Sequence, residues 1–292
     1  MYIVDTSICL PVGWKQTLPK VDQLWVSRTL FKFKQNGWPE LDMTKVNKMW
    51  WYPPQPSLTA NNKPRVDRYF AQPLLLWMPR KLWKIQLRCP NTDCDGEDLT
   101  SSGLHKRVRQ VVDISGYYNL ASECLVCRKC KGINISWSLG ILRQLDIGHR
   151  LQFPCILTSK LACDVKIIRL LRQRGLGNSS SQIYRKLNEQ HSESFLQHAA
   201  HYLTDCEGFS SAASTGLVLP VTFDELPRLV PVPSYRWLMQ VYLQDVLQRK
   251  DEVMAGITSL FGRVLKVTIN YSNNVWIINL LLLLLLVCLC VT

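Results

Sequence analysis

The chain of 292 residues carries 35 Lys or Arg against 22 Asp or Glu, which gives a formal net charge of +13. Hydrophobic residues make up 47% of it and aromatic residues 10%, which excludes an intrinsically disordered chain and is enough for two modest domains. The positive charge favours contact with a polyanion, either nucleic acid or an anionic membrane surface.

Residues 1–79 form a region rich in tryptophan and proline that has no sustained helix or strand period. Proline and glycine breaks separate its tryptophans, which include Trp14, Trp25, Trp38, Trp50 and Trp51. We expect extended segments that wrap a neighbouring domain and pack through these aromatic side chains. Recognition of the proline-rich run by a partner is the alternative.

Residues 80–150 contain two tight cysteine groups, CPNTDC and CLVCRKC. Four thiolates that converge at about 2.3 Å make the tetrahedral site that zinc prefers. The predicted zinc ligands are Cys89, Cys94, Cys127 and Cys130. Disulfides would need an oxidising compartment, and Met1–Leu10 does not have the pattern of a signal peptide. Replacement of one ligand by Cys124 or His105 is the alternative within the site.

The residues between the two cysteine groups have the pattern of a zinc-ribbon hairpin. Lys106–Ile114 mixes β-branched and basic residues, Ser115 and Gly116 supply a turn, and Tyr117–Leu125 returns as a second strand. Alternation over Leu82–Cys89 predicts a further strand that leads to the metal. So small a sheet has little core, so a zinc ion contributing roughly 10–16 kcal/mol would make metal binding and folding inseparable.

Residues 151–209 are predicted to be mainly helical. Apolar residues at three- and four-residue steps predict a helix over Ile156–Gln173, which the glycine-containing run at 175–178 ends. A second helix begins near Ser180, and Ser192 is expected to cap a third. Two helices joined by a short glycine-containing turn are typical of a helix-turn-helix, and an ordinary basic helical bundle is the alternative.

Positive charge is concentrated in this helical region. Seven Lys or Arg lie between Lys160 and Lys186, against one acidic residue, Asp164. In a helix-turn-helix the early residues of the second helix reach base edges in the major groove. The predicted nucleic-acid-binding residues are Lys106, Arg107, Arg109, Arg169, Arg172, Arg174, Gln182, Arg185 and Lys186.

The C-terminal part is predicted as a proline-containing linker over 210–234, a long helix and a strand start within 235–268, and a hydrophobic tail over 269–292. Val275–Thr292 has no charged side chain, and eighteen helical residues rise about 27 Å, which is a marginal membrane span. The alternative is that the residues after Lys266 are intron sequence read in frame.

Several long runs, among them LLLWMPRKLW, CPNTDC, RGLGNSSSQIYRKLNEQHSE and DEVMAGITSLFGRVLK, resemble a family of transposon-derived animal proteins called domain of unknown function 6729. The similarity covers roughly Trp38 to Lys266. It implies a nuclear, DNA-associated and zinc-containing front end of a transposase-like protein. In that family the cysteines correspond to the four predicted ligands, and Cys124 stands where relatives tend to have tyrosine. In longer relatives an Asp-containing strand follows, whereas VTINYSNN follows Lys266 here.

The sequence therefore predicts an α+β chain with a small zinc-ribbon-like antiparallel sheet, a mainly helical region after it, and a C-terminal hydrophobic helix. We expect a non-enzymatic zinc protein that binds duplex DNA, because no nucleophile elbow, phosphate-binding glycine loop or HExxH run is present. The alternative is a membrane-tethered zinc-ribbon module that binds a protein partner and crosses the membrane once.

Overall fold

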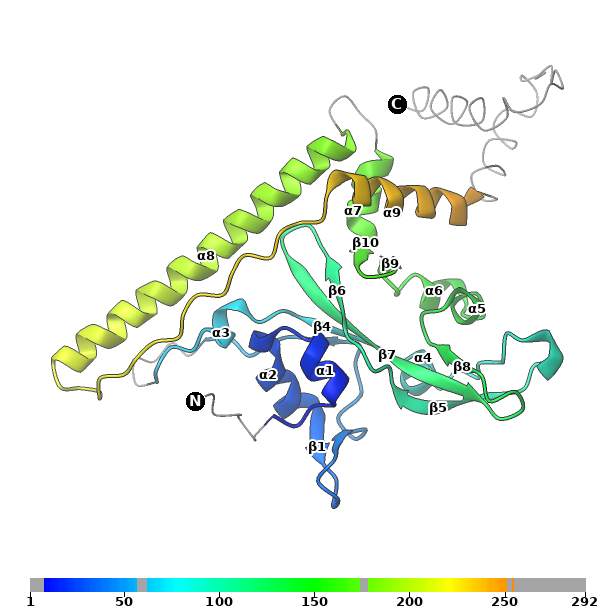
Figure 1. The fold of residues 1–292 in the computed structure, drawn as a ribbon, viewed down its shortest axis with the longest axis horizontal. Helices are drawn as coiled ribbons and strands as arrows, with labels where there is room; N and C mark the ends of the chain where they lie inside the picture. Colours follow the sequence, from blue (N-terminus) through cyan, green and yellow to red (C-terminus); the bar gives the residue numbers. More distant parts are fainter. Residues whose placement is uncertain (1–7, 57–61, 174–177, 251–253, 255–292) are drawn as a thin grey trace. The chain divides into compact units, whose positions relative to one another are not determined.

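The computed structural model describes residues 8–56, 62–173, 178–250 and 254 of the chain. Their fold is mixed α+β, as predicted (Figure 1). The chain divides into two compact units. The first contains residues 1–164 and 189–230, and the second contains residues 165–188 and 231–292.

The first unit is organised around β7 (Tyr117–Cys127), a strand of eleven residues in an eight-stranded mixed sheet. The first half of β7 pairs in parallel with β4 (Leu74–Trp77) and antiparallel with β6 (Arg109–Val112). Its second half pairs antiparallel with β5 (Leu99–Leu104) and β8 (Ile133–Ile135). The other strands of this sheet are β3 (Trp50–Trp51), β9 (Cys155–Leu157) and β10 (Ala162–Asp164).

The predicted small antiparallel ribbon is therefore only one part of a larger sheet that also contains parallel strand pairs. The predicted hairpin around residues 115 and 116 is present as β6 and the start of β7. The sheet extends further because Leu74–Trp77 is a run of four buried apolar residues. Such a run is typical of a strand that is covered on both faces.

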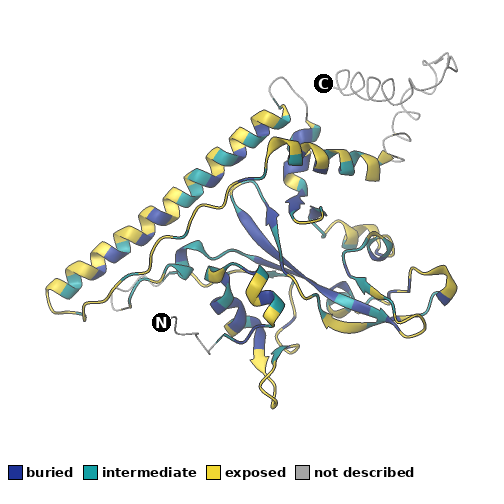
Figure 2. Ribbon diagram, in the orientation of Figure 1, coloured by how far each residue is buried: buried dark blue, intermediate teal, exposed yellow. Residues whose placement is uncertain are grey.

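Both faces of the sheet are packed at β4. Leu74 and Leu76 belong to one apolar cluster, whereas Leu75 and Trp77 belong to another. Successive side chains of a strand point to opposite faces, so this division places one core on each side of the sheet. The dark blue strands in the middle of Figure 2 show this burial.

Two N-terminal helices, α1 (Val12–Thr17) and α2 (Lys20–Leu30), supply much of the first cluster. From α2 the buried Asp22 carboxylate accepts hydrogen bonds from Gln72 N at 2.6 Å and from Asn119 Nδ2 at 2.8 Å. Burial raises the pKa of Asp22 to about 6. This one carboxylate thus ties α2 both to β7 and to the segment before β4.

The tryptophans of the N-terminal region mostly pack in the core, as predicted, but the expected extended segments are wrong for Trp14 and Trp25, which lie in α1 and α2. Trp14, Trp25 and Trp51 are buried, and the indole N–H of Trp14 donates to the backbone oxygen of His105 at 2.9 Å. Trp38 differs, because 66% of its surface is exposed. The aromatic-packing interpretation is therefore wrong for Trp38, which lies beyond the core at the end of a hairpin.

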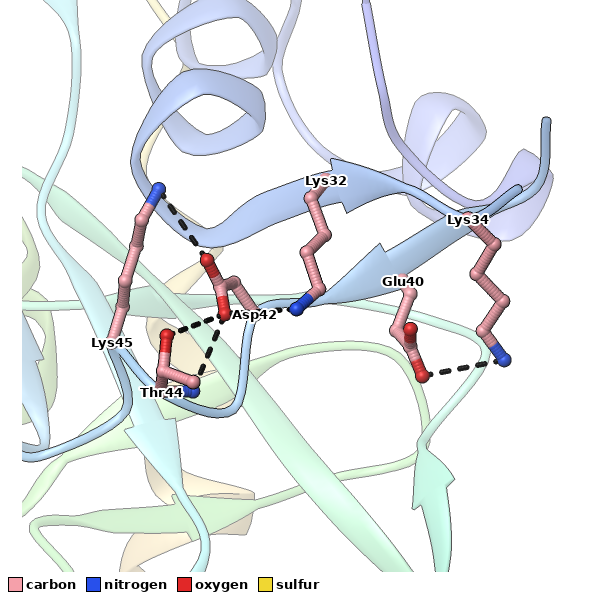
Figure 3. Close-up of polar contacts among 6 residues, drawn as sticks. All are labelled: Lys32, Lys34, Glu40, Asp42, Thr44 and Lys45. Carbon is pink, nitrogen blue, oxygen red and sulfur yellow. Dashed lines mark hydrogen bonds and ion pairs between the residues drawn. The ribbon is translucent and has the colours of Figure 1, made fainter.

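That hairpin is a separate two-stranded antiparallel sheet of β1 (Phe31–Phe33) and β2 (Pro39–Leu41). Figure 3 shows a polar network at its base, centred on Asp42. Asp42 Oδ1 accepts from Thr44 Oγ1 at 2.7 Å and lies 3.3 Å from Lys32 Nζ. The Thr44 hydroxyl, followed by Lys32, lowers the pKa of Asp42.

Four short helices connect the strands. They are α3 (Asp67–Phe70), α4 (Pro79–Trp83), α5 (Leu139–Leu142) and α6 (Ile147–Arg150). The predicted strand over Leu82–Cys89 is wrong, because Pro79 begins α4 and Lys84, at φ 55°, ends it in the left-handed region. Within the predicted range, only Arg88 makes a β-bridge, to Asp98.

The predicted helix over Ile156–Gln173 forms only in its second half, as α7 (Val165–Arg172). The first half is the antiparallel pair of β9 and β10. The turn between these strands is closed by Thr158, whose hydroxyl donates to the Leu161 backbone oxygen at 2.8 Å. A polar turn of this kind separates two short strands. The apolar residues at three- and four-residue steps therefore predicted a helix where the chain forms a strand pair.

The next helix, α8 (Ser180–Ser214), is a single helix of 35 residues. The predicted break at Ser192 is wrong. The run from Ser180 to Glu207 contains neither proline nor glycine, and the neighbouring His191 is buried with its Nε2 atom 2.8 Å from the backbone oxygen of Asp113. This contact within the first unit, together with the absence of helix-breaking residues, favours continuation of the helix.

The predicted linker begins later than expected, since α8 continues through Ser214. Residues 217–233 then form neither helix nor strand. In Figure 1 the part in the first unit runs back alongside α8. The Tyr202 hydroxyl of α8 donates to the backbone oxygen of Asp224 at 2.8 Å, which fixes this extended segment to the helix.

The second unit contains α7, the first turns of α8, and α9 (Tyr235–Gln248). The predicted long helix is present as α9, and Ser234 caps it, since its Oγ atom accepts from Trp237 N at 3.4 Å. Arg172 of α7 donates from two nitrogens to the buried carboxylate of Asp245, at 2.8 and 2.5 Å. This bidentate ion pair joins α7 to α9.

The predicted strand start near residue 268 and the hydrophobic tail over 269–292, including Val275–Thr292, lie outside the described residues. Within the part of the chain that the structure describes, no helix combines the length and apolar character that a membrane span requires.

Glu123 of β7 provides a test of this packing. The residue is fully buried, and its Oε1 atom accepts from Arg80 N at 3.1 Å, while Oε2 has no hydrogen-bond partner among the described residues. Burial raises the pKa of Glu123 from 4.5 to about 7. The folded protein therefore holds this proton more tightly than the unfolded chain does, so the associated stability is complete below pH 4.5 and is lost as the pH rises to about 7.

We expect Glu123→Gln to remove this dependence. Relative to the unsubstituted protein, its free energy of unfolding should gain about 2–3 kcal/mol between pH 5 and pH 8, measured by urea denaturation at each pH. Glu207→Gln, on the exposed face of α8, is the matched control and should show no such gain. Equal pH profiles for the two variants would contradict the assignment.

Candidate metal centre

Four cysteines meet at one end of the sheet in the first unit, and they are the four that the spacing predicted. Their Sγ atoms all lie within 4.8 Å of one another. Cys89 and Cys130 are 3.8 Å apart, and Cys94 and Cys127 are also 3.8 Å apart. Cys130 is exposed, whereas the other three are buried.

Strand pairing brings the two cysteine groups together. Leu99, five residues after Cys94, pairs with Cys127 in the register of β5 and β7. The backbone N–H of Leu99 also donates to Leu87 O at 2.8 Å, so the chain before Cys89 lies on the other side of β5. Because β5 lies between β7 and the segment before Cys89, the two cysteine loops come together at the same end of the sheet.

The first loop is a tight turn around η1 (Thr92–Cys94). Cys89 N donates to the Glu97 backbone oxygen at 2.8 Å, and Glu97 N donates to the Cys94 oxygen at 3.0 Å. Asp95 and Gly96 both have positive φ, at 49° and 72°. These two left-handed residues reverse the chain, so that both thiols of the loop face the second cysteine pair.

The second loop, residues 127–132, follows the end of β7. Lys131 N donates to the Cys127 backbone oxygen at 3.0 Å, and Gly132 N donates to Cys130 Sγ at 3.4 Å. A Cβ atom on Gly132 would lie 3.1 Å from that sulfur. The loop therefore directs a backbone N–H toward a thiol, which stabilises the thiolate form that binds metal.

The surroundings of the buried thiols act in opposite directions on their acidity. The backbone N–H groups of Cys130 and Lys129 lower the pKa of Cys127 to about 7. Burial, followed by the neighbouring thiols, raises the pKa of Cys94 to about 12. A bound divalent cation would displace these protons, so metal affinity is expected to increase with pH.

The geometry fits a tetrahedral metal ion. Four sulfurs at about 2.3 Å from a central ion stand about 3.8 Å apart along each edge of the tetrahedron. Two of the sulfur–sulfur distances equal this value, and the others are no longer than 4.8 Å. Tetrahedral sites of four thiolates suit zinc or iron, and all four positions of the ion would be taken by protein atoms.

The metal centre is continuous with the second apolar core of the sheet. Cys89, Cys94 and Cys127 belong to the same cluster as Trp77 and Ile141. The predicted ribbon with little core of its own is therefore corrected, because β4 and α5 supply that core. Loss of metal is expected to unfold the cysteine loops first, with the shared core retained by the larger sheet.

Gln144 holds the first cysteine loop in place. Its Oε1 atom accepts from Arg88 N at 2.7 Å, and its Nε2 atom donates to the Arg88 backbone oxygen at 2.9 Å. The side-chain amide thus pairs with the residue before Cys89 in the way that a strand would. Sequence reasoning missed Gln144, because one polar residue after a short helix gives no signal of this pairing.

The two cysteine loops carry opposite charges. The first holds the acidic residues Asp93, Asp95, Glu97 and Asp98, and the second holds the basic residues Arg128, Lys129 and Lys131. One ion pair, between Lys129 Nζ and Asp95 Oδ2, joins them at 3.0 Å. A divalent ion with four thiolates has a net charge of −2, which the basic loop offsets in part.

Neither alternative ligand belongs to the group. Cys124 precedes Cys127 by three residues on one strand, so its side chain points to the opposite face of β7. The Nδ1 atom of His105 is 3.0 Å from the backbone oxygen of Arg107, away from the thiols.

The predicted nucleic-acid contacts of the first unit differ in accessibility. Lys106 and Arg107 are exposed. Arg109 is half-buried, donates to the Thr158 backbone oxygen at 2.6 Å, and lies over the Trp137 ring at 5.2 Å. Arg109 therefore has a structural role in the fold.

The contacts predicted in the second unit divide in the same way. Arg169, Gln182, Arg185 and Lys186 are exposed, whereas Arg172 is used in the ion pair with Asp245. Arg174 lies outside the described residues. Of the described basic residues predicted in the second unit, Arg169, Arg185 and Lys186 are thus accessible to a ligand, and Arg172 is not.

Replacement of Gln144 tests how the first loop is held. We expect Gln144→Ala to lower the affinity for the metal ion by roughly 10-fold or more, because supports behind metal ligands typically contribute this much. Competition with a chromophoric chelator measures the affinity. Gln152→Ala, which changes an exposed glutamine in the following loop, is the control and should leave it unchanged. Equal affinities for both variants would show that the Arg88 contacts do not support the site.

Comparisons with known proteins identify a family. No curated protein and no solved structure matches the chain. The family model described as a domain of unknown function (DUF6729) matches residues 14–247, a span of 234 of the 292 residues. This span includes the four cysteines of the metal centre and most of the described residues of both units. The chain therefore belongs to the DUF6729 family.

Proposed function

We propose that the four cysteines hold one structural zinc ion. The observation that carries this proposal is the convergence of four thiols with spacings that match a tetrahedral thiolate site. Four protein ligands leave no position for water or substrate, which is typical of structural zinc and unlike catalytic zinc. We prefer zinc to iron because zinc has no redox chemistry, so a structural site that holds zinc does not change with redox conditions.

We further propose that the protein is a DNA-binding module. Gln182, Arg185 and Lys186 are exposed on α8, and the two basic residues follow Gln182 by three and four positions, so both neighbour it on the helix surface. Ile183 and Leu187 of the same turns are buried. A helix whose opposite face is buried and whose exposed face is basic is suited to insertion into the major groove of duplex DNA.

The charge of the second unit supports the same proposal. Residues 165–188 contain six Lys or Arg and no Asp or Glu. One of them, Arg172, is neutralised by Asp245, and Arg185 and Lys186 form no ion pair among the described residues. An unneutralised basic surface attracts phosphate and releases counterions when it binds.

The wider biological setting follows from the resemblance to transposon-derived proteins. We propose a nuclear module that descends from a transposase and acts by binding rather than by catalysis. A zinc centre closed by four protein ligands agrees with a binding role. Zinc sites of this kind also occur in modules that bind proteins, so the salt dependence of DNA binding is the decisive measurement.

The metal proposal predicts the composition of the purified full-length protein. Elemental analysis should find about one zinc per chain, and Cys94→Ser should reduce this value strongly, because a tetrathiolate site loses affinity with one ligand. Cys124→Ser, outside the group, is the matched control and should retain the metal. Stoichiometric iron with visible thiolate absorption, or a metal-free protein whose cysteine loops remain ordered, would contradict zinc.

The DNA proposal predicts salt-dependent binding by the full-length chain. Fluorescence anisotropy with a blunt duplex should show affinity that falls with salt, and the double variant Arg185→Ala/Lys186→Ala should reduce the slope by about 1.8, since two phosphate contacts are lost.

The control removes the same charge elsewhere. Lys20→Ala/Arg228→Ala changes two exposed basic residues of the first unit and should leave the slope nearly unchanged. If both double variants lower affinity equally, the α8 face is not the binding surface. If the zinc-loaded protein has no salt-dependent affinity at low salt, duplex binding is excluded.

A further inference from the structure

The β1–β2 hairpin extends from the first unit with aromatic side chains uncovered. Figure 1 shows it below α1 and α2, and Figure 2 shows that its outer end is exposed. Phe33 is 54% exposed and Trp38 is 66% exposed. These exposed rings contribute little to the core, so both are accessible to a ligand.

The strand register places these two side chains on opposite faces. Phe33 pairs with Pro39, and Lys32 pairs with Glu40. Lys34 N donates to the Trp38 backbone oxygen at 2.9 Å, which continues the pairing by one step. By alternation, Trp38 shares its face with both lysines, whereas Phe33 lies on the other face.

The backbone around Trp38 is held by three hydrogen bonds. Besides the bond from Lys34, Gly37 N donates to the Lys34 oxygen at 2.9 Å, and Trp38 N donates to Asn36 Oδ1 at 3.2 Å. Gly37 has a φ of 77°, which a residue with a Cβ atom would adopt with strain. The exposed indole is therefore presented on an ordered turn.

The base of the hairpin is anchored in the core. Phe31 and Leu41 are buried, and the Phe31 ring contacts Trp14 edge to face at 5.2 Å. The Asp42 network holds Lys32 and Lys45 beside the strands (Figure 3). The hairpin thus projects from a rigid support, which lowers the entropy lost when a ligand binds.

The hairpin and its flanks are positively charged. Residues 28–48 contain five basic residues and two acidic ones. Lys34 Nζ lies 3.3 Å from Glu40 Oε1, with both side chains more than 40% exposed. Exposed pairs of this kind contribute roughly 0–1 kcal/mol, so a phosphate group can replace the carboxylate.

The chemistry of the tip favours nucleic acid over other partners. Gln35 and Asn36 are polar and exposed, so insertion of the tip into a hydrocarbon layer would leave their amides without water. Lysine is depleted at protein interfaces, yet Lys32 and Lys34 share the face of Trp38. An aromatic ring flanked by cations is typical of proteins that stack on the bases of a single strand.

We propose that the β1–β2 hairpin binds single-stranded nucleic acid, with Trp38 stacked on an unpaired base and Lys34 on a flanking phosphate. The ring face of an unpaired base is free to stack on the indole, whereas two neighbouring base pairs of a duplex would first have to unstack. This binding is independent of the duplex contacts proposed on α8, and the two can succeed or fail separately.

The test uses the full-length chain and a twelve-residue oligothymidine with one central 2-aminopurine. Binding of the unsubstituted protein should change 2-aminopurine fluorescence, and Trp38→Ala should weaken affinity roughly 5- to 100-fold, while Trp38→Phe retains most of it. Lys34→Ala should reduce the salt slope by about 0.7. Because Trp38 is exposed, its variants are expected to keep the thermal unfolding midpoint.

Tyr52→Ala is the matched control, since Tyr52 is 67% exposed and lies outside the hairpin. It should leave affinity unchanged. Equal affinities for Trp38→Ala and the unsubstituted protein would overturn the proposal. So would Trp38-dependent binding to phosphatidylserine vesicles without binding to the oligonucleotide. Loss of duplex binding in Arg185→Ala/Lys186→Ala, with oligothymidine binding retained, would support separate sites.

Discussion

The first unit depends on β7, because this strand contributes both to the apolar core and to the cysteine site. The first half of β7 is fixed by β4 and β6 within buried apolar layers, and its last residue, Cys127, is a candidate metal ligand. A shift of one residue in this strand would exchange its two faces, so the core and the thiols would be lost together. The register that buries Leu120 and Leu125 is therefore the register that aligns the cysteines.

Charge is distributed so that the metal centre and the ligand-binding surfaces have different environments. The first cysteine loop is acidic, whereas the residues proposed to bind nucleic acid on α8 and on the β1–β2 hairpin are basic and exposed. Two predicted contacts, Arg109 and Arg172, are used inside the fold. In the proposed arrangement the metal ion orders the first unit, and recognition uses exposed basic residues of α8 and of the β1–β2 hairpin.

The parts predicted from sequence are those with a local signal. The paired spacing of the four cysteines and the hairpin around residues 115 and 116 each depend on nearby residues. The long helix α8 and the parallel pairing of β4 depend on contacts between distant segments, such as His191 with Asp113. Local propensity does not contain such contacts. For the same reason the sequence did not predict the role of Gln144, which hydrogen-bonds to the backbone of Arg88, 56 residues earlier.

The Asp22 carboxylate has a consequence for the order in which the protein can be made. Its two strongest partners are the backbone of Gln72 and the amide of Asn119, which follow it by 50 and 97 residues. A ribosome that adds about 5–20 residues per second needs roughly 5–20 s to reach Asn119 after Asp22. During that interval α2 has an apolar face and no sheet to cover it. The face of α2 that packs in the folded protein is thus exposed to solvent until β7 leaves the ribosome.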